Sequence, residues 1–189
     1  MQRVSLHQKG FTLIEIIAGL IALSLSFVVL SVIIFPQAQR SVEPVFQARA
    51  SALGQALLEE IMSKAFDQNS DFSGGTLRCA EVNAPPCTEP ANFGPDNESR
   101  ANFNDVDDYH LLEVSNSQLE DALGTDLASR YRNFSYSIAI CYSDRQGTCR
   151  DLNLYPSTNL NLYRYKRVQV TVTTPTAQEF TFSAVRGNY

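Results

Sequence analysis

Hydrophobic residues form one unbroken block near the N-terminus and recur at regular intervals further along the chain. The block covers Phe11–Phe35, where Glu15 is the only charged residue. As an α-helix rising ~1.5 Å per residue it would be ~37 Å long, which exceeds the ~30 Å hydrocarbon core of a bilayer. It is also longer than the apolar core of a secretory signal peptide. The block therefore predicts a transmembrane helix over residues 11–35.

A second helical pattern begins after Pro44. Apolar residues recur three to four positions apart, at Phe46, Ala50, Leu53, Leu57, Ile61 and Ala65. This spacing places them on one face and predicts an amphipathic helix over residues 45–66 that packs on a sheet. Because Pro36 and Pro44 both lack a backbone N–H, we expect a break in the helical structure between them.

The last third of the chain alternates between apolar and polar residues, which is typical of β-strands with one buried face. The clearest alternation covers Tyr131–Tyr142, and a second one covers Tyr163–Thr173. A third strand is expected around Phe180 and Phe182. Because the connections between consecutive strands are short, we predict an antiparallel sheet within residues 131–189.

Asn, Asp, Ser, Gly and Pro are concentrated between the predicted helix and the predicted sheet. These residues favour turns, so residues 67–130 are expected to be rich in loops, with one short helix at Ser115–Leu123. A long N-terminal helix, with a membrane half and an amphipathic half, packed on a C-terminal antiparallel sheet is an α+β fold. We therefore predict a leader at residues 1–10, the membrane helix, and a head domain at residues 36–189.

The formal net charge of the chain is −5. An acidic chain lacks the broad basic surface that nucleic acids require, so no nucleic-acid partner is expected. Arg164, Lys166 and Arg167 form one small basic patch on a predicted strand. We expect it to be a solvated face or one that protects a sheet edge, and DNA capture is the alternative. Arg3 and Lys9 precede the apolar block and should stay in the cytoplasm, which places the rest of the chain across the membrane.

Four cysteines form two close pairs in the sequence, Cys79 with Cys87 and Cys141 with Cys149. An even number of cysteines beyond a membrane segment predicts disulfides in an oxidising compartment. Cysteine pairs that bind zinc usually have two to four intervening residues, whereas each of these pairs has seven, so local disulfides are expected. The sequence leaves open a pairing of Cys79 with Cys141.

Glu15 lies inside the apolar block, where an unpaired carboxylate costs roughly 2.5–3.5 kcal/mol on membrane-insertion scales. Cleavage after Gly10 would create a cationic amine at Phe11, about one helical turn from Glu15. The carboxylate could pair with its own amine or with that of a neighbouring copy, and the second arrangement would fix the register between helices. The alternative is that Glu15 reaches the nearby membrane interface on its own.

The segment KGFTLIE at residues 9–15, followed by a long apolar helix, resembles the class III signal of type IV pilins and type II secretion pseudopilins. The resemblance covers about the first 35 residues. It implies cleavage after Gly10 by a prepilin peptidase, methylation of the Phe11 amine, and a role of Glu15 in subunit docking. The helix-on-sheet pattern derived above is also the pilin architecture.

Three further segments, residues 36–44, 103–110 and 168–173, resemble minor pilins of the mannose-sensitive hemagglutinin (MSHA) pilus. This resemblance implies a low-copy subunit that helps to start or cap the fibre. The expected partners are other major and minor pilins, the prepilin peptidase, the inner-membrane assembly platform and, before assembly, membrane lipid. The expected location is the inner membrane with the head in the periplasm, and afterwards the fibre at the cell surface. The alternatives are a type II secretion minor pseudopilin and a signal-anchored periplasmic binding module that does not polymerise.

An acidic cluster and a lone histidine are the remaining candidates for chemistry. Asp105, Asp107 and Asp108 lie in a stretch rich in Asp and Asn, and such oxygen-rich loops can bind calcium. The twelve-residue EF-hand pattern is absent, so solvated or turn-capping carboxylates are the alternative. A mature chain would keep one histidine, His110, which we expect at the surface. This inventory does not indicate an enzyme, and no cofactor other than calcium is expected.

Overall fold

The computed structural model describes residues 10–70, 77–115, 118–120, 125–150 and 162–188, without the side chains of residues 34–41. The leader up to residue 9 and most of the helix predicted at Ser115–Leu123 lie outside the described residues. The chain divides into two compact units, Met1–Pro44 and Val45–Tyr189.

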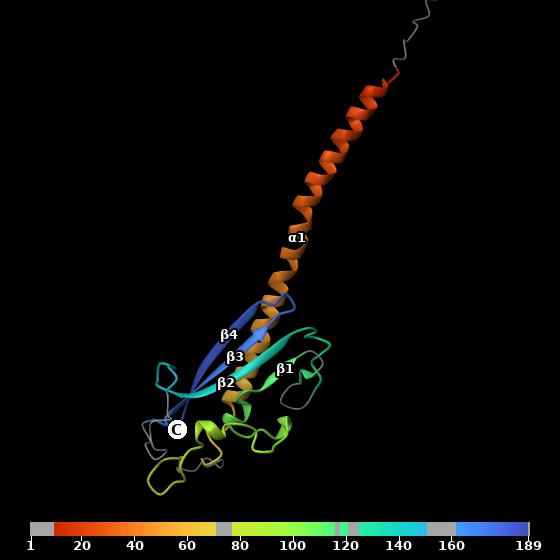
Figure 1. The fold of residues 1–189 in the computed structure, drawn as a ribbon. Coiled ribbons are helices and arrows are strands. Elements are labelled where there is room, and N and C mark those ends of the chain that lie inside the picture. The colour runs from red at the N-terminus through yellow and green to blue at the C-terminus, as the bar shows by residue number, and fades with distance from the viewer. Residues whose placement is uncertain (1–9, 71–76, 116–117, 121–124, 151–161, 189) are drawn as a thin grey trace, which may run out of the picture. The chain divides into compact units, whose positions relative to one another are not determined.

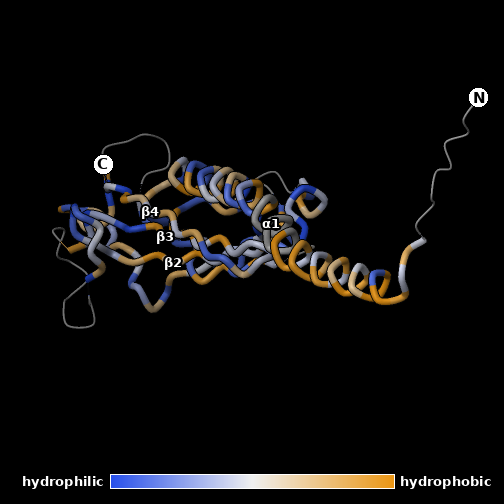
Figure 2. The backbone as a smooth tube through the Cα atoms, turned by 90° about the horizontal axis from the view of Figure 1, so that it is seen from above, coloured by the Kyte–Doolittle hydropathy of each residue, from blue (hydrophilic) through white to orange (hydrophobic). Residues whose placement is uncertain are grey.

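One long helix, α1, covers Leu13–Met62. It continues through Pro36 and Pro44, which corrects the predicted break between these prolines, and it ends before the predicted residue 66. Each proline removes only one backbone N–H, so the neighbouring residues can keep the helical hydrogen bonds on both sides. Its first part is mostly apolar, as the predominant orange colour in Figure 2 shows, with Glu15 in the first turn as the exception.

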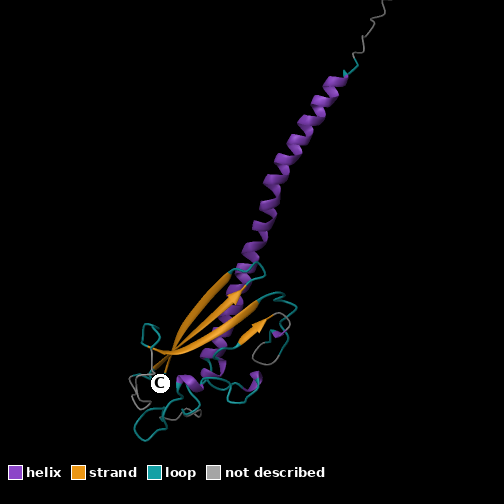
Figure 3. Ribbon diagram, in the orientation of Figure 1, coloured by secondary structure: helices purple, strands orange, loops and turns teal. Residues whose placement is uncertain are grey.

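Four strands form one antiparallel sheet in the order β1–β2–β3–β4 (Figures 1 and 3). The strands are β1 at Glu113–Ser115, β2 at Ser135–Ser143, β3 at Tyr165–Thr173 and β4 at Glu179–Gly187. β2 and β3 pair along their whole length, with Ser135 opposite Thr173, and β3 pairs with β4 in the same way. The α+β fold and the antiparallel sheet are therefore confirmed, whereas β1 was not predicted.

The hydrophobic core lies between the last part of α1 and one face of the sheet. The helix contributes the buried side chains of its predicted stripe, Ala50, Leu53, Leu57 and Ile61. Alternate residues of β2 and β3 face them, namely Tyr136, Ile138, Ile140, Val168, Val170 and Val172. Gly54 allows α1 to approach β4 closely, because a Cβ atom there would lie 2.3 Å from the Phe182 ring.

Both predicted disulfides are present in the Val45–Tyr189 unit. The Cα atoms of Cys79 and Cys87 are 4.8 Å apart, and those of Cys141 and Cys149 are 5.7 Å apart. The pairing of Cys79 with Cys141 is therefore excluded. Between α1 and β2 the described chain forms β1 and three short 3-10 helices, η1 at Pro90–Asn92, η2 at Arg100–Asn102 and η3 at Asp107–Tyr109.

Candidate functional site

The first candidate site is the exposed apolar segment of α1. All side chains from Gly10 to Ile33 are exposed, including Phe11 at 80% and Phe27 at 73% of their surface. Leu13–Ile33 is long and apolar enough to cross a membrane, by length and composition alone. A continuous apolar surface of this extent requires an apolar environment, because water is a poor solvent for it.

Three serines lie within this segment without leaving hydroxyl groups unsatisfied. The Oγ atoms of Ser24, Ser26 and Ser31 each donate a hydrogen bond of 2.8 Å to the backbone carbonyl four residues earlier. A hydroxyl that bonds to its own helix needs no external partner in an apolar medium. The serines therefore do not oppose contact of the segment with lipid or with other apolar helices.

Thr12 and Glu15 organise the start of α1. Thr12 Oγ1 accepts a hydrogen bond from the Glu15 backbone N–H at 3.4 Å, and the Thr12 carbonyl accepts bonds from the N–H groups of Glu15 (3.0 Å) and Ile16 (3.2 Å). Thr12 is thus the N-cap, and the Thr-x-x-Glu spacing is that of a capping box. A carboxylate in the first turn also interacts favourably with the helix dipole. Sequence reasoning missed the role of Thr12, although this spacing before an apolar run is a known signal.

Gly10 and Phe11 lie immediately before the helix. Both residues are exposed and outside regular secondary structure, and apart from Gly10 and its two chain neighbours no heavy atom of the described structure lies within 4 Å of the position that a Cβ atom of Gly10 would take. The peptide bond between them is therefore open to a peptidase in the described structure. Glu15 is exposed, and among the described residues no side chain donates a hydrogen bond to its carboxylate.

The second candidate site is the buried lysine of β3. Lys166 is fully buried, and its Nζ donates hydrogen bonds to the Phe66 carbonyl (2.7 Å), to Asp67 Oδ2 (2.9 Å) and to Asp107 Oδ1. The prediction that Lys166 faces solvent was wrong. It has the same strand parity as the buried Val168, so its side chain points to the interior, where carboxylates from two distant segments neutralise it.

Aromatic rings surround the Lys166 ammonium group. Its Nζ lies 4.6 Å from the centroid of the Phe66 ring, 5.1 Å from that of Phe93 and 5.3 Å from that of Tyr142. A cation over aromatic faces is stabilised by the ring quadrupoles, and the rings also keep water away. We call Lys166, Asp67, Asp107 and these three rings the lysine cluster.

Asp67 is fixed within the lysine cluster by hydrogen bonds from several segments. The backbone N–H groups of Asn69 and Thr88 each donate at 3.0 Å, Thr88 Oγ1 donates at 3.1 Å, and Tyr142 Oη lies 3.1 Å from Oδ2. Burial alone would raise the pKa of Asp67, but Lys166 and these hydrogen bonds outweigh it and hold the pKa below its usual value. Asp67 is therefore ionised at neutral pH.

Asp105 is buried just before η3, and Asp107 and Asp108 are buried in its first turn. Asp108 Oδ2 accepts hydrogen bonds from the N–H groups of Asn104 (2.8 Å) and Asp105 (3.1 Å), and Asp107 binds Lys166. Burial and the neighbouring charge of Asp107 raise the pKa of Asp105 to about 8. Turn capping and a protein cation account for the contacts of Asp107 and Asp108, and Asp105 Oδ1 accepts a hydrogen bond from the Asp108 N–H at 3.2 Å, whereas Asp105 Oδ2 has no hydrogen-bond partner among the described residues. These contacts lend no support to calcium, which stays a prediction.

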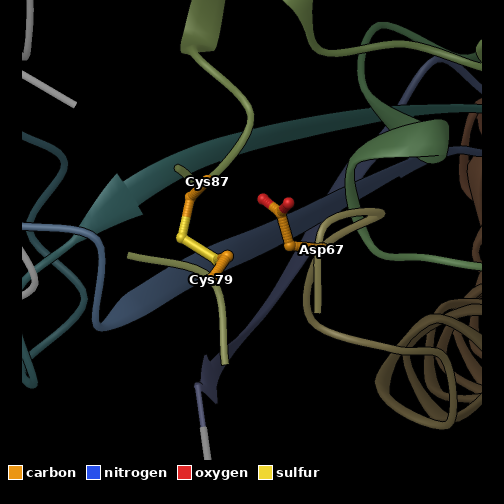
Figure 4. A group of neighbouring side chains, drawn as sticks. All are labelled: Asp67, Cys79 and Cys87. Atoms are coloured by element: carbon orange, nitrogen blue, oxygen red, sulfur yellow. A yellow bond between two sulfur atoms is a disulfide. The ribbon is translucent and has the colours of Figure 1, made fainter. Parts of the chain in front are cut away.

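Asp67 also lies beside the Cys79–Cys87 disulfide (Figure 4). One carboxylate oxygen and the two sulfur atoms lie within 4.8 Å of one another and are all buried, which is a spacing that a metal ion could use. The sulfur atoms are bonded to each other, however, and a metal requires thiolates. The group is therefore a packing contact between the disulfide and the lysine cluster while the disulfide is intact.

His110 is not the surface group that the sequence predicted. It is half-buried, its Nδ1 accepts a hydrogen bond of 3.0 Å from the Ile140 N–H, and its ring packs edge-on against Phe93. Burial lowers the pKa of His110, so the ring is neutral at pH 7 and Nδ1 can act as the acceptor. His110 therefore joins the η3 turn to β2.

The predicted basic patch is also changed by the burial of Lys166. Arg164 is exposed, and Arg167 is half-buried and donates a hydrogen bond of 3.3 Å to the Gly147 carbonyl. With Lys166 in the interior, the three cations do not form one continuous surface. This arrangement removes the basis for DNA capture at this strand.

No family model, characterised protein or solved structure matches this chain. What the chain does must therefore be inferred from its own residues.

Proposed function

We propose that this chain is a minor structural subunit of a type IV pilus and not an enzyme. The observation that carries the proposal is the exposed apolar segment of α1, with Glu15 in its first turn, directly after the exposed Gly10–Phe11 junction. A bilayer and a bundle of like helices both provide the apolar environment that this segment needs. The resemblance of residues 9–15 to the class III signal supports lipid as the first environment and the helix bundle as the second.

Cleavage and methylation prepare the subunit for assembly in this proposal. A prepilin peptidase removes the cytoplasmic leader after Gly10, and the new Phe11 amine is methylated and stays cationic. Glu15 of an incoming subunit then pairs with the amine of a subunit that is already in the fibre. One charge pair inside an otherwise apolar bundle fixes the register between helices, and the cap at Thr12 holds the first turn in shape.

The subunit starts in the inner membrane, with residues 36–189 in the periplasm, and ends in the fibre at the cell surface. Transfer from lipid to the fibre exchanges one apolar environment for another, so the assembly platform does not have to expose the apolar segment to water. The partners are other major and minor pilins. The resemblance of residues 36–44, 103–110 and 168–173 supports the D-type minor pilin of the MSHA pilus as the finer assignment, with a role in starting or capping the fibre.

The first experiment is an intact-mass measurement of the protein purified from its native membranes, with and without a reducing agent. The expected N-terminus is Phe11 with one added methyl group, and reduction of both disulfides should add four hydrogens. An unmethylated, full-length chain would contradict the processing route. The signal-anchored binding module would then be the better proposal.

A second experiment tests docking directly. Glu15→Gln keeps the shape of the side chain and removes its charge, so processing and membrane insertion should continue while incorporation into sheared fibres falls. Glu59→Gln makes the same chemical change at an exposed position of α1 outside the apolar segment and serves as the control. Equal amounts of the wild type and the Glu15→Gln variant in the fibres would rule out a docking role of Glu15.

A further inference from the structure

We propose that Lys166 and Asp107 form an intramolecular amide bond in the folded protein, with Asp67 as the proton carrier. The amine and the carboxyl group are in contact, and their side chains are 0% and 2% exposed. A second buried carboxylate, that of Asp67, touches the same amine. These residues all belong to the Val45–Tyr189 unit, so the proposal does not depend on the pilus assignment.

The fold holds the two reacting side chains on well-fixed backbone. Lys166 lies in β3, where it is paired with Tyr142 on one side and Arg186 on the other. Asp107 opens η3, and the chain directly after η3 is bonded to β2 through the Leu111 N–H and the Ile138 carbonyl at 3.0 Å. Fixed intramolecular partners reach effective concentrations on the order of 10⁵–10⁸ M, which no pair of free molecules attains.

The surroundings also favour the protonation states that the reaction needs. Amide formation requires a neutral amine and a neutral carboxylic acid, whereas water stabilises the charged forms of both. The rings of Phe66, Phe93 and Tyr142 exclude water around Nζ, so a proton can pass from Nζ to Asp107 at a smaller cost than in water. Burial raises the pKa of Asp107, and the nearby charge of Asp67 acts in the same direction, against the attraction of Lys166.

The bond-forming step is balanced by the groups that are present. The neutral Nζ of Lys166 attacks Cγ of Asp107, and a C–N bond forms. Asp67 Oδ2, 2.9 Å from Nζ, accepts the proton that the attacking nitrogen loses and passes it to the departing hydroxyl group of Asp107. The C–O bond breaks and one water molecule leaves. One ammonium and one carboxylate thus become one amide and one water, with no oxidant, reductant or other reactant.

The reaction replaces one pair of opposite buried charges with a neutral amide, and the Asp67 carboxylate keeps its hydrogen bonds from Asn69, Thr88 and Tyr142. A buried ion pair pays the desolvation of two charges, whereas an amide is neutral and keeps one N–H for hydrogen bonding. The Phe66 carbonyl and Asp67 Oδ2 are both in place to accept from that N–H. The bond would join η3 to β3 across 59 positions, while each disulfide joins residues only 8 positions apart.

The test is an intact-mass measurement and a tryptic map of the full chain purified from its native membranes and reduced. We expect the mass to lie one water below the mass calculated for the processed chain. Trypsin does not cut after an acylated lysine, so the digest should contain residues 101–130 joined to residues 165–167. Lys166→Arg and Asp107→Ala should each have the full calculated mass, with no loss of water. Asp67→Asn should lose the water molecule more slowly after synthesis than the wild type does. Lys64→Arg, which changes a lysine outside the lysine cluster, should leave the loss unchanged.

The wild-type digest decides the question even if a variant fails to fold. A full mass together with a free Tyr165–Lys166 peptide would overturn the proposal and leave a plain ion pair. A water loss that persists in Lys166→Arg would also overturn it, because the bond would then lie elsewhere. Leader cleavage and methylation alter only the N-terminal peptide, so a failure of the pilus proposal would be recorded separately.

Discussion

Relative to the chain in which Lys166 and Asp107 are still an ion pair, replacing Lys166 with methionine should destabilise the head by about 3–5 kcal/mol. Methionine has a similar length but no charge, so the variant leaves Asp67 and Asp107 buried without their shared cation. Removing one partner of a buried ion pair costs about this much, because the remaining charge is uncompensated. Since small domains have only about 5–15 kcal/mol of stability, the variant should lose a large share of it.

The loss should also depend on pH in a defined direction. Without the cation, the two buried carboxylates bind protons more readily, so lowering the pH from 7 towards 4 neutralises them and reduces the cost in the variant. In the wild-type ion pair, the lowered pKa of Asp67 contributes stability above its unfolded pKa, and this contribution is lost as the pH falls through the folded value. Both effects reduce the difference in the free energy of unfolding between the wild type and Lys166→Met at low pH.

Urea unfolding in detergent, followed by the near-UV circular dichroism of tyrosine, measures this difference. The chain has no tryptophan, and all eight tyrosines lie in the Val45–Tyr189 unit, so the signal reports only on the head. Arg164→Met removes the same charge from an exposed position of the same predicted basic patch and should change stability by no more than about 0.5 kcal/mol. A loss below about 1 kcal/mol for Lys166→Met, or a loss independent of pH, would refute the reasoning.

Three further predictions concern other parts of the chain. Gly54→Ala should lower the melting temperature, because overpacking against Phe182 costs about 1–3 kcal/mol and exceeds the ~1 kcal/mol gain in helix propensity. Adding Phe182→Leu to this variant should recover most of the lost stability. A higher melting temperature for Gly54→Ala alone would contradict the close contact. Asp105→Asn should be more stable than the wild type at pH 8.5, because the raised pKa of Asp105, about 8 against 3.8, makes wild-type stability fall by up to about 1.4 kcal/mol per pH unit between these values. The advantage of the variant should shrink as the pH is lowered towards 4. Urea titrations at pH 8.5 and near pH 4 check this, and equal stability of the two proteins at pH 8.5 would be inconsistent with a raised pKa. Thr12→Val should weaken the start of α1 by about 1 kcal/mol and speed hydrogen exchange of the first-turn amides in bilayers, and unchanged exchange would mean that the Thr12 hydroxyl is not a cap.

The parts of the fold that follow from local patterns were predictable from the sequence. The two-residue alternation of β2 places Ile138 and Ile140 in the core, and both are buried. The helical spacing likewise identifies Leu53 and Leu57 as core residues of α1. In each case neighbouring residues carry the signal, so no information about distant contacts is needed. The disulfides were predictable for the same reason, because each joins cysteines that are close in the sequence.

The lysine cluster could be predicted only in part. Lys166 has the parity of Val168 and Val170, which already marks its side chain as interior, but a lysine is rarely buried without a partner. Its partners, Asp67 and Asp107, lie 99 and 59 positions away, and only the folded chain brings them together. The three-residue strand β1 escaped prediction because it is too short to show an alternation.

Unlike the lysine cluster, the candidate assembly site could be predicted almost entirely from the sequence. Gly10, Phe11 and Glu15 lie within six positions, so the sequence identified them as a group, whereas the structure added the cap at Thr12. The sequence analysis did not predict that α1 continues through Pro44. A proline in the sequence indicates the loss of one backbone hydrogen bond, but it does not show whether the neighbouring turns keep theirs.

The short span of the disulfides has a consequence for how the chain becomes oxidised. Four cysteines allow three pairings, and a bond between Cys79 and Cys141 would close a loop of 141 − 79 = 62 positions instead of 8. Closing the longer loop costs about 2 kcal/mol more in chain entropy, so collision alone favours the native partner by about 20-fold in the unfolded chain. A newly exported chain can therefore find its native cysteine partners before its sheet has formed, with little need for enzymes that reshuffle disulfides.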